Sequence, residues 1–373
     1  MRLPSARKFF RRLFVLLIAG FCLFVIGAVV FTAKCKSVPV AFQPTPETSR
    51  HRPETAGIAG YLRGEDETFL TYPEWFIVWS YQEKADFQQN HLPSGFPFFG
   101  SIAQYWRGYC CANRIVRGRY PFNTGDHLML AVIGSSFSVE YGLKGIYEET
   151  IGRFTEWLSG HEPVEEDVYA YQVAREYADF VHIRPFYEFH FGRSFAGLWK
   201  DTRLWGPHPV RKWERKLWLA LDYGVEALYC GLIEKASHSV YGVEDDQTYA
   251  WIENATDSVL AANPRVRKVK EVGPQAYIVM IPRYQEFTNI VESLARQGVR
   301  FVQIAGNEQV ALTVVVPRDR GSSVPGTEML FSIGLLTQPG LQRVELRAPV
   351  SSLHTVLNAM VDRGVKVEHV YDF

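Results

Sequence analysis

The amino-acid sequence predicts an α+β protein with an N-terminal transmembrane anchor, a duplicated, mainly helical domain and a C-terminal ferredoxin-like α/β sandwich. Three observations predict this organisation. Residues 13–33 carry no charged side chain, several blocks between 72 and 240 occur twice in the same order, and the segment after 263 alternates strand-like and helix-like patterns. The expected boundaries are 1–12 for a cytoplasmic tail, 13–33 for the transmembrane helix, 34–62 for a proline-rich spacer, 63–262 for the duplicated domain and 263–373 for the ferredoxin-like domain.

The N-terminal segment is typical of a membrane anchor, because about 20 apolar residues in a helix cross a hydrocarbon core of roughly 30 Å. The cations before it are Arg2, Arg7, Lys8, Arg11 and Arg12. Only Lys34 and Lys36 follow it closely. The positive-inside rule therefore places the N-terminus in the cytoplasm and the bulk of the chain in a periplasmic or other extracytoplasmic compartment. A cleaved signal peptide has a shorter apolar region, so we expect an uncleaved signal anchor that passes once through the inner (plasma) membrane.

The segment after the anchor, 34–62, contains Pro39, Pro44, Pro46 and Pro53 and shows no hydrophobic periodicity. Such a composition is typical of an extended spacer, which spans up to roughly 3 Å per residue. The sequence therefore predicts a link that separates the folded part from the bilayer.

The helical domain shows an internal repeat. VWSYQ (78–82) resembles VYAYQ (168–172), and EKADF (83–87) matches EYADF (176–180) if the second copy has three extra residues. Further along, SIAQYWR (101–107) matches SFAGLWK (194–200), and VEYGLKGIYEETIGR (139–153) matches LDYGVEALYCGLIEK (221–235). Matched blocks in one order predict two related helical units, at about 72–158 and 162–240, because a solenoid would need shorter and more numerous repeats.

Each copy places a Tyr-Gly pair inside a predicted helix, with glycines at Gly142 and Gly224. A glycine inside a helix costs about 1 kcal/mol relative to alanine, so we expect a close helix crossing that excludes a β-carbon. The second helix also has apolar residues at helical spacing, namely Leu217, Leu221, Leu228 and Leu232. This spacing predicts a helix with one apolar face.

The C-terminal segment carries strand-like runs at 276–282, 299–305, 309–317, 328–336, 342–348 and 365–371, with helical patterns at 284–298 and 351–364. Two helix–strand units resemble each other, ARQGVRFVQI (295–304) and VDRGVKVEHV (361–370). Two βαβ units with strands between them are typical of a ferredoxin-like fold. A fold of this kind specifies no activity by itself.

Two groups of residues are weak candidates for catalysis. Glu188, His190 and Arg193 lie together in the aromatic stretch FYEFHFGR (186–193), where burial would shift carboxylate and imidazole pKa values. The alternative is a helix start with solvent-exposed polar residues.

Glu140 and Asp222 are equivalent in the two copies, so they could converge if the Tyr-Gly helices pack together. Paired carboxylates could bind a metal or serve acid–base chemistry. The alternative is an exposed ladder of Glu140, Lys144 and Glu148 at four-residue spacing.

The cluster RKWERK (211–216) precedes the apolar stretch 217–233. A basic cluster followed by tryptophan and apolar residues suits a helix at anionic lipid headgroups. The alternative is a helix buried against its repeat partner, and the sequence leaves both open.

Several site classes have no support in the sequence. There is no phosphate-binding glycine loop, no nucleophile elbow and no zinc signature, so we expect no cofactor and no metal. Lys plus Arg and Asp plus Glu both number 40, so net charge gives no reason to expect nucleic acid as a partner. Among the cysteines, a disulfide from Cys230 to Cys110 or Cys111 and unpaired thiols remain alternatives.

These patterns favour a non-catalytic function: a membrane-anchored, envelope-facing binding or assembly module for a lipid surface or a protein partner. The alternative is an enzyme that acts on a lipid or another membrane-borne substrate through carboxylates of the duplicated domain. A deep aromatic pocket with converging carboxylates would favour the enzyme, whereas a filled core and an exposed apolar surface would favour the binding module.

Overall fold

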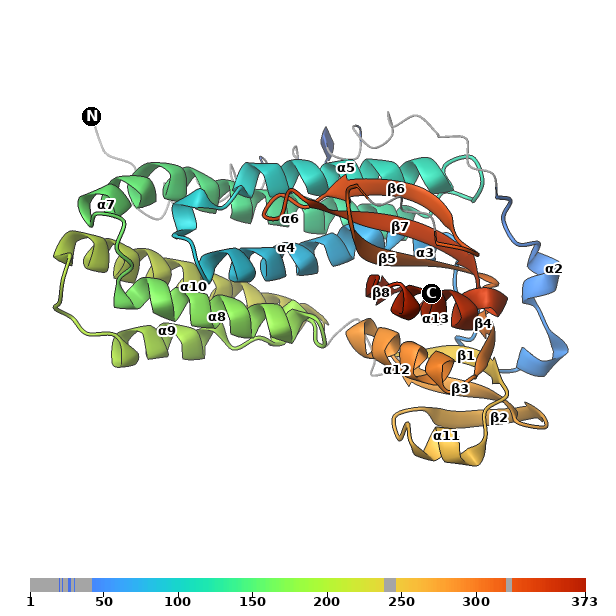
Figure 1. Cartoon of the computed structure of the whole chain (residues 1–373). Helices are drawn as coiled ribbons and strands as arrows, with labels where there is room; N and C mark the ends of the chain where they lie inside the picture. The colour runs from blue at the N-terminus through green and yellow to red at the C-terminus, as the bar shows by residue number, and fades with distance from the viewer. Residues whose placement is uncertain are drawn as a thin grey trace.

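The computed structural model describes residues 42–237, 246–319 and 324–373, together with the helical positions Gly20, Cys22, Ile26, Gly27 and Val30. The tail and the membrane span predicted at 13–33 otherwise lie outside the described residues. Among the helices that are described, none is long and apolar enough to cross a membrane. The chain is α+β, with helices in the N-terminal part and two antiparallel sheets in the C-terminal part, as Figure 1 shows.

Residues 42–62 do not form a free spacer. This segment holds α2 (Glu47–Arg50) and a 3₁₀ turn, η1 (Pro53–Thr55), and it lies against the sheets. Phe42 and Tyr61 are buried, and the Tyr61 hydroxyl donates to Gln303 at 3.1 Å. The expected extended link is therefore wrong for this part, because its two aromatic side chains are buried against the folded body.

Four successive elements of the helical part have counterparts later in the chain. The first set is α3 (Glu67–Leu70), α4 (Tyr72–Gln88), η2 (Pro93–Gly95), α5 (Phe98–Val116), α6 (Thr124–Tyr147), the π-helical turn η3 (Glu148–Gly152) and α7 (Arg153–Leu158). The second set is α8 (Glu165–Val181), η4 (Phe186–Glu188), α9 (Phe191–Asp201) and α10 (Pro209–Ser237). Helix, short 3₁₀ turn, helix and long helix thus follow one another in both, at α4–α6 and at α8–α10.

Backbone geometry gives the register between these two sets. Helices α4 and α8 both contain 17 residues, and the residues before α5 and α9 have nearly the same angles, φ −81° and ψ 65° at Pro97, and φ −88° and ψ 67° at His190. This register pairs Ala85 with Ala178, which are both fully buried, and needs no insertion. The resemblance of VWSYQ to VYAYQ is therefore three residues out of structural register.

The expected close helix crossing at the Tyr-Gly pairs is wrong. A β-carbon at Gly142 or Gly224 would meet no atom within 4 Å, because both glycines face away from the packed interior. The close contact in α6 lies at Gly134 instead, where a β-carbon would overlap the ring of Tyr105. Tyr105 is fully buried and its hydroxyl donates to the carbonyl oxygen of Leu130 at 2.6 Å, so the ring has no room to move.

We expect opposite effects from two alanine substitutions in α6. Gly134→Ala should lower the free energy of unfolding by about 1–3 kcal/mol, because the added methyl group overpacks the core. Gly142→Ala should raise it by about 0.5–1 kcal/mol, because alanine favours the helix and meets no obstacle. Chemical denaturation of the full-length protein in detergent measures both. If Gly142→Ala destabilises as strongly as Gly134→Ala, the packing described here is wrong.

The first sheet contains β1 (Gln247–Glu253), β2 (Arg267–Gly273), β3 (Ala276–Pro282) and β4 (Arg300–Ile304) in the order β2-β3-β1-β4, with α11 (Asp257–Ala261) and α12 (Tyr284–Arg296). The second contains β5 (Gln309–Pro317), β6 (Glu328–Gly334), β7 (Leu341–Pro349) and β8 (Lys366–Val370) in the order β6-β7-β5-β8, with η6 (Val350–Ser352) and α13 (Leu353–Asp362). All pairings are antiparallel.

This arrangement differs from the single domain expected from 263. The chain forms two four-stranded sheets, and the first begins with β1, which pairs with both β3 and β4. A cut at 263 would therefore remove a central strand. The resemblance between 295–304 and 361–370 has a structural counterpart, since each segment runs from the end of a helix into an edge strand, β4 or β8.

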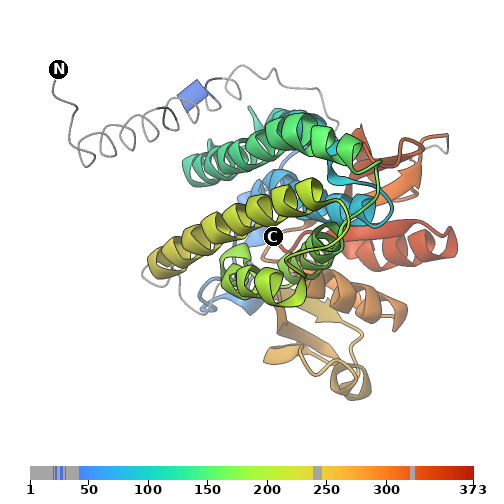
Figure 2. The ribbon, with the colours of Figure 1, turned by 90° about the vertical axis from the view of Figure 1, so that its left-hand side faces the viewer.

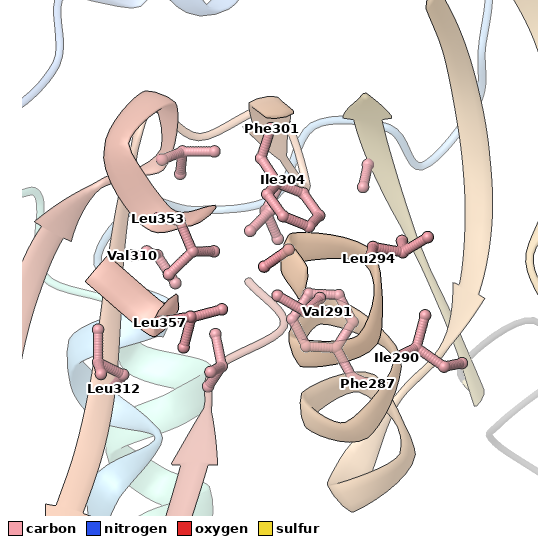
Figure 3. Packing of buried hydrophobic residues seen from close by; sticks show 14 of the residues in the cluster. Phe287, Ile290, Val291, Leu294, Phe301, Ile304, Val310, Leu312, Leu353 and Leu357 are labelled. Carbon is pink, nitrogen blue, oxygen red and sulfur yellow. The ribbon is translucent and has the colours of Figure 1, made fainter. Parts of the chain in front are cut away.

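One apolar core joins the two sheets. Figure 3 shows Phe287, Val291 and Leu294 of α12 close to Leu353 and Leu357 of α13, and all are buried. The cluster also takes residues from both sheets, so the two sheets pack as one body.

The second sheet is also attached to the helical part. Its Ala311 and Ile333 and the nearby Tyr371 belong to the core cluster of α4 and α5. Trp75 of α4 stacks on His369 of β8 with ring centroids 3.6 Å apart. Glu83 of α4 forms a buried ion pair with Arg343 of β7. The helical part therefore has a fixed position on the sheets, as Figure 1 shows.

Candidate functional site

Helices α6 and α10 lie side by side and run in opposite directions (Figure 2). Lys144 of α6 contacts Asp222, and three residues later Tyr147 stacks on Trp218 with ring centroids 3.6 Å apart. The next residue, Glu148, pairs with Arg215 at 2.7 Å. As the α6 number rises the α10 number falls, so the pair is antiparallel.

A charged cluster lies between these two helices. The Nζ atom of Lys144 is 2.8 Å from Glu140, 3.2 Å from Asp222 and 3.5 Å from Glu226. The hydroxyl of Tyr81 donates to Glu140 at 2.6 Å. The structure thus brings together Glu140 and Asp222, as one hypothesis from the repeat required. The ladder alternative fails, because Lys144 is buried and serves carboxylates of both helices.

Burial and charge shift pKa values in this cluster. Burial alone would lower the pKa of Lys144, but Asp222, Glu140 and Glu226 together hold it well above its ordinary value. Burial raises the pKa of Glu226 to about 7, with a further contribution from the charge of Glu140. Burial also lowers the pKa of Lys84 to about 8, and the nearby charge of Lys144 adds to this. The cluster therefore holds a lysine that is charged near neutral pH and a carboxyl group that titrates there.

A small cavity of about 60 Å³ adjoins this cluster. Its lining includes Tyr81, Lys84, Glu140, Lys144, Tyr177 and Glu226. Sites for drug-sized ligands measure about 300–1,000 Å³, so this one has room for a few water molecules or a small ion. In the part of the chain that the structure describes, no group of three or more His, Cys, Asp or Glu residues could hold a metal ion.

A second charged network buries the four cations of the RKWERK cluster. Arg211 is fully buried and lies 2.9 Å from Asp167, 2.9 Å from Glu214 and 3.3 Å from Glu156. Lys216 is fully buried too and lies 3.1 Å from Glu166. Of the two alternatives for these cations, contact with lipid headgroups is wrong, because acids at the start of α8 and in α7 neutralise them inside the protein.

The aromatic stretch at 186–193 does not form a site. Glu188 pairs with Arg184, four residues before it in the sequence, at 3.1 Å. The side chains of His190 and Arg193 are exposed, and among the described residues no hydrogen bond or ion pair joins the three candidate side chains. This is the solvent-exposed helix start that the sequence left as the alternative.

The matched blocks EKADF and EYADF each contain an aspartate with a structural partner. Asp86 and Asp179 both pair with Arg175, at 2.6 Å and 3.5 Å. Among the cysteines, Cys110 is disulfide-bonded, whereas Cys111 and Cys230 are free thiols. A disulfide between Cys230 and Cys110 or Cys111 is therefore not formed.

The outer side of α6, and of α10 as far as residue 233, is apolar. From 127 in α6 to Glu148 just after it, and from 209 to 233 in α10, no charged residue is exposed, although the two stretches contain many; Glu234, the next residue of α10, is exposed. Leu143, Leu221 and Leu228 are 61%, 59% and 73% exposed. We call this surface the outer face and define it by Leu128, Met129, Val132, Val139, Leu143, Ile146, Leu217, Leu221, Val225, Leu228 and Leu232.

The neighbouring helix α8 shows the ordinary pattern. Its exposed residues include Gln172, Arg175, Glu176 and Asp179, as expected for a helix in water. In α6 and α10 the pattern is inverted, with charges inside and leucines outside. Sequence reasoning identified the stripe of Leu217, Leu221, Leu228 and Leu232 but left open whether it faces a membrane or the repeat partner. Comparison with known proteins finds no matching family model, no matching curated protein and no matching solved structure.

Proposed function

We propose that this chain is a non-catalytic binding or assembly module, anchored in the membrane by 13–33, whose folded body acts outside the cytoplasm. The observation that carries the proposal is the outer face of α6 and α10. Monomeric soluble proteins seldom expose large contiguous apolar surfaces, and such surfaces are typical of sites for a protein or a membrane. Helices α6 and α10 turn the charged residues of these two stretches inward and expose Leu143, Leu221 and Leu228, so we infer that this side is a binding surface.

The alternative is an enzyme that uses the carboxylates of the helical part, and the convergence of Glu140 and Asp222 favours it. Two features weigh against this alternative. Lys144 neutralises these carboxylates by direct contact, and the adjoining cavity of about 60 Å³ is too small for a lipid substrate. The cluster is better explained as the interior that allows the outer face to remain free of charge.

The finer organisation belongs to this proposal. The equal lengths of α4 and α8 and the matching backbone at Pro97 and His190 support an internal duplication of the helical part. The element order β-α-β-β-α-β of the first sheet supports a ferredoxin-like unit. The second sheet repeats the strand order of the first, and among the described residues no helix lies between β5 and β6, so we propose two such units in tandem.

Two observations support the extracytoplasmic position. The cations Arg2, Arg7, Lys8, Arg11 and Arg12 precede the predicted span. Cys110 is disulfide-bonded, and disulfides persist mainly in oxidising compartments outside the cytoplasm.

Hydroxyl-radical footprinting of the full-length protein in its native membrane tests the proposal. Leu143 and Leu228 should be protected from modification, because a partner covers the outer face. Val168 and Ile183 are apolar controls of similar exposure, 51% and 59%, and lie outside the outer face, so they should be modified. Equal modification of all four residues would show that nothing covers the outer face. Release of the chain from membranes by alkaline carbonate would overturn the anchor.

A further inference from the structure

We propose that the partner of the outer face is the lipid bilayer itself, on which α6 and α10 lie flat at the boundary between headgroups and acyl chains. This inference rests on the proposed function, since it names what the binding surface contacts. The bound chemistry is that of a phospholipid surface, and the folded body would be held against the same membrane that contains 13–33.

The distribution of charge is the first argument. In membranes, ionisable side chains face the protein interior and pair with one another, because an unpaired charge in hydrocarbon is costly. Lys144 with Glu140, Asp222 and Glu226 follows this pattern, as does Arg215 with Glu148. A surface made for water would gain solubility from the same side chains by turning them outward.

The dimensions of the outer face fit a helix pair that lies in the plane of the membrane. At 1.5 Å per residue, α6 is about 36 Å long and α10 about 43 Å. Amphipathic helices at the interface bury their apolar face about 5–10 Å deep. The structure fits this position, because helix α8 presents polar residues to water.

Exposed aromatic residues mark the end of the pair where α7 meets the start of α10. Trp157 of α7 and Trp205 before α10 are 64% and 74% exposed. Phe122, just before α6 and so at the opposite end of this antiparallel pair, is 69% exposed. Tryptophan in particular is enriched at the level of the lipid headgroups, so Trp157 and Trp205 suit the rim of a surface that rests on a bilayer.

The length of the link decides between a bilayer and a second copy of the chain, since either could cover an apolar face. The predicted span ends at 33 and the described body starts at Phe42, which is buried beside Phe69 at a centroid distance of 5.2 Å. Eight residues, 34–41, reach at most about 29 Å. Arg119, between α5 and α6, lies over the Phe42 ring, so the link leaves the body near the start of α6. The bilayer is therefore always within reach, at a high effective concentration.

Site-specific photo-crosslinking tests this inference with the full-length protein. A photoreactive amino acid replaces Leu143 or Leu228, and the protein is reconstituted into vesicles of phosphatidylethanolamine and phosphatidylglycerol. Both positions should form lipid adducts, several-fold more than the controls at Val168 and Ile183. Adducts mainly with a second copy of the chain, or with peptides from 13–33, would overturn the inference.

A variant that introduces charge into the outer face provides the second arm. With the photoreactive group at Leu221, the double variant L143E/L228E should form several-fold less lipid adduct than the unsubstituted background. The matched variant V168E/I183E should leave the adduct unchanged, because those positions face water. Equal adduct in all three would overturn the inference. If footprinting shows protection of Leu143 and Leu228 without lipid adducts, the bilayer is wrong and the binding module remains; if it shows no protection, the proposed function itself fails.

Discussion

Replacing Lys144 with methionine is expected to lower the free energy of unfolding by about 3–5 kcal/mol, because it leaves buried carboxylates without their cation. Lys144 lies within 3.5 Å of Glu140, Asp222 and Glu226, and methionine keeps its length but not its charge. Chemical denaturation of the full-length protein in detergent measures the loss. Lys200→Met is the matched control, since Lys200 is exposed on α9 and its loss should cost less than about 0.5 kcal/mol.

The pH dependence of this loss separates charge from packing. Burial raises the pKa of Glu226 to about 7 in the folded protein, above the ordinary value of 4.5. Between these two values the folded state binds more protons than the unfolded state, so stability falls as pH rises from about 4.5 to 7. Without Lys144 this fall should be steeper. The difference between Lys144→Met and the unsubstituted protein should be small below pH 5 and largest above pH 7, whereas an equal difference at every pH would indicate lost packing.

The division into a helical part and a sheet part could be predicted from sequence, and the structure confirms it. Strand β3 lies at 276–282, where the run AYIVMIP predicts it. Strand β1 was missed, although TYAWI (248–252) has strand-forming residues. It comes between α10 and α11 in the sequence, away from the strands that were predicted. Strand β2 was missed as well, and without these two strands the first sheet could not be recognised, since the remaining elements suffice for one ferredoxin-like pattern.

Convergence of Glu140 and Asp222 was accessible from the repeat, because equivalent positions in two copies meet when the copies pack face to face. The role of Glu226 was not accessible, since it depends on the antiparallel register of α6 and α10. The close helix crossing expected at Gly142 and Gly224 was wrong because the sequence does not show which side of each helix meets a neighbour. Helical periodicity identifies a stripe, but it does not say whether the stripe faces a neighbour or the outside.

Helix α10 shows this ambiguity most clearly. It carries an apolar stripe through Leu221 and Leu228 and a charged stripe through Arg215 and Asp222, at the same spacing. The hydrophobic effect favours burial of the apolar stripe. The structure buries the charged one, because Glu148 and Lys144 of the neighbouring α6 segment supply partners of opposite charge. Those partners lie more than 60 positions away in the sequence, so only the tertiary structure shows which stripe faces inward.

The cluster RKWERK, for which the sequence left lipid contact and burial open, leads to the final prediction. Arg211→Met should lower the free energy of unfolding by about 3–5 kcal/mol, because Glu156, Asp167 and Glu214 lose a fully buried cation. An interfacial contact with anionic lipid predicts the opposite pattern, an almost unchanged stability and weaker binding to vesicles that contain phosphatidylglycerol. The substitution therefore distinguishes a structural cation from a lipid-binding one.

Arg203→Met is the matched control for Arg211→Met. Arg203 is also an arginine with a carboxylate partner, Glu165 at 3.6 Å, but its side chain is 83% exposed. Exposed ion pairs contribute about 0–1 kcal/mol, so this variant should unfold at nearly the same denaturant concentration as the unsubstituted protein. A loss confined to Arg211→Met supports the buried network and leaves the leucines of α6 and α10 as the groups that contact the bilayer. If both variants are equally stable and Arg211→Met alone detaches from anionic vesicles, the cations are at the surface and the inverted arrangement of α10 is wrong.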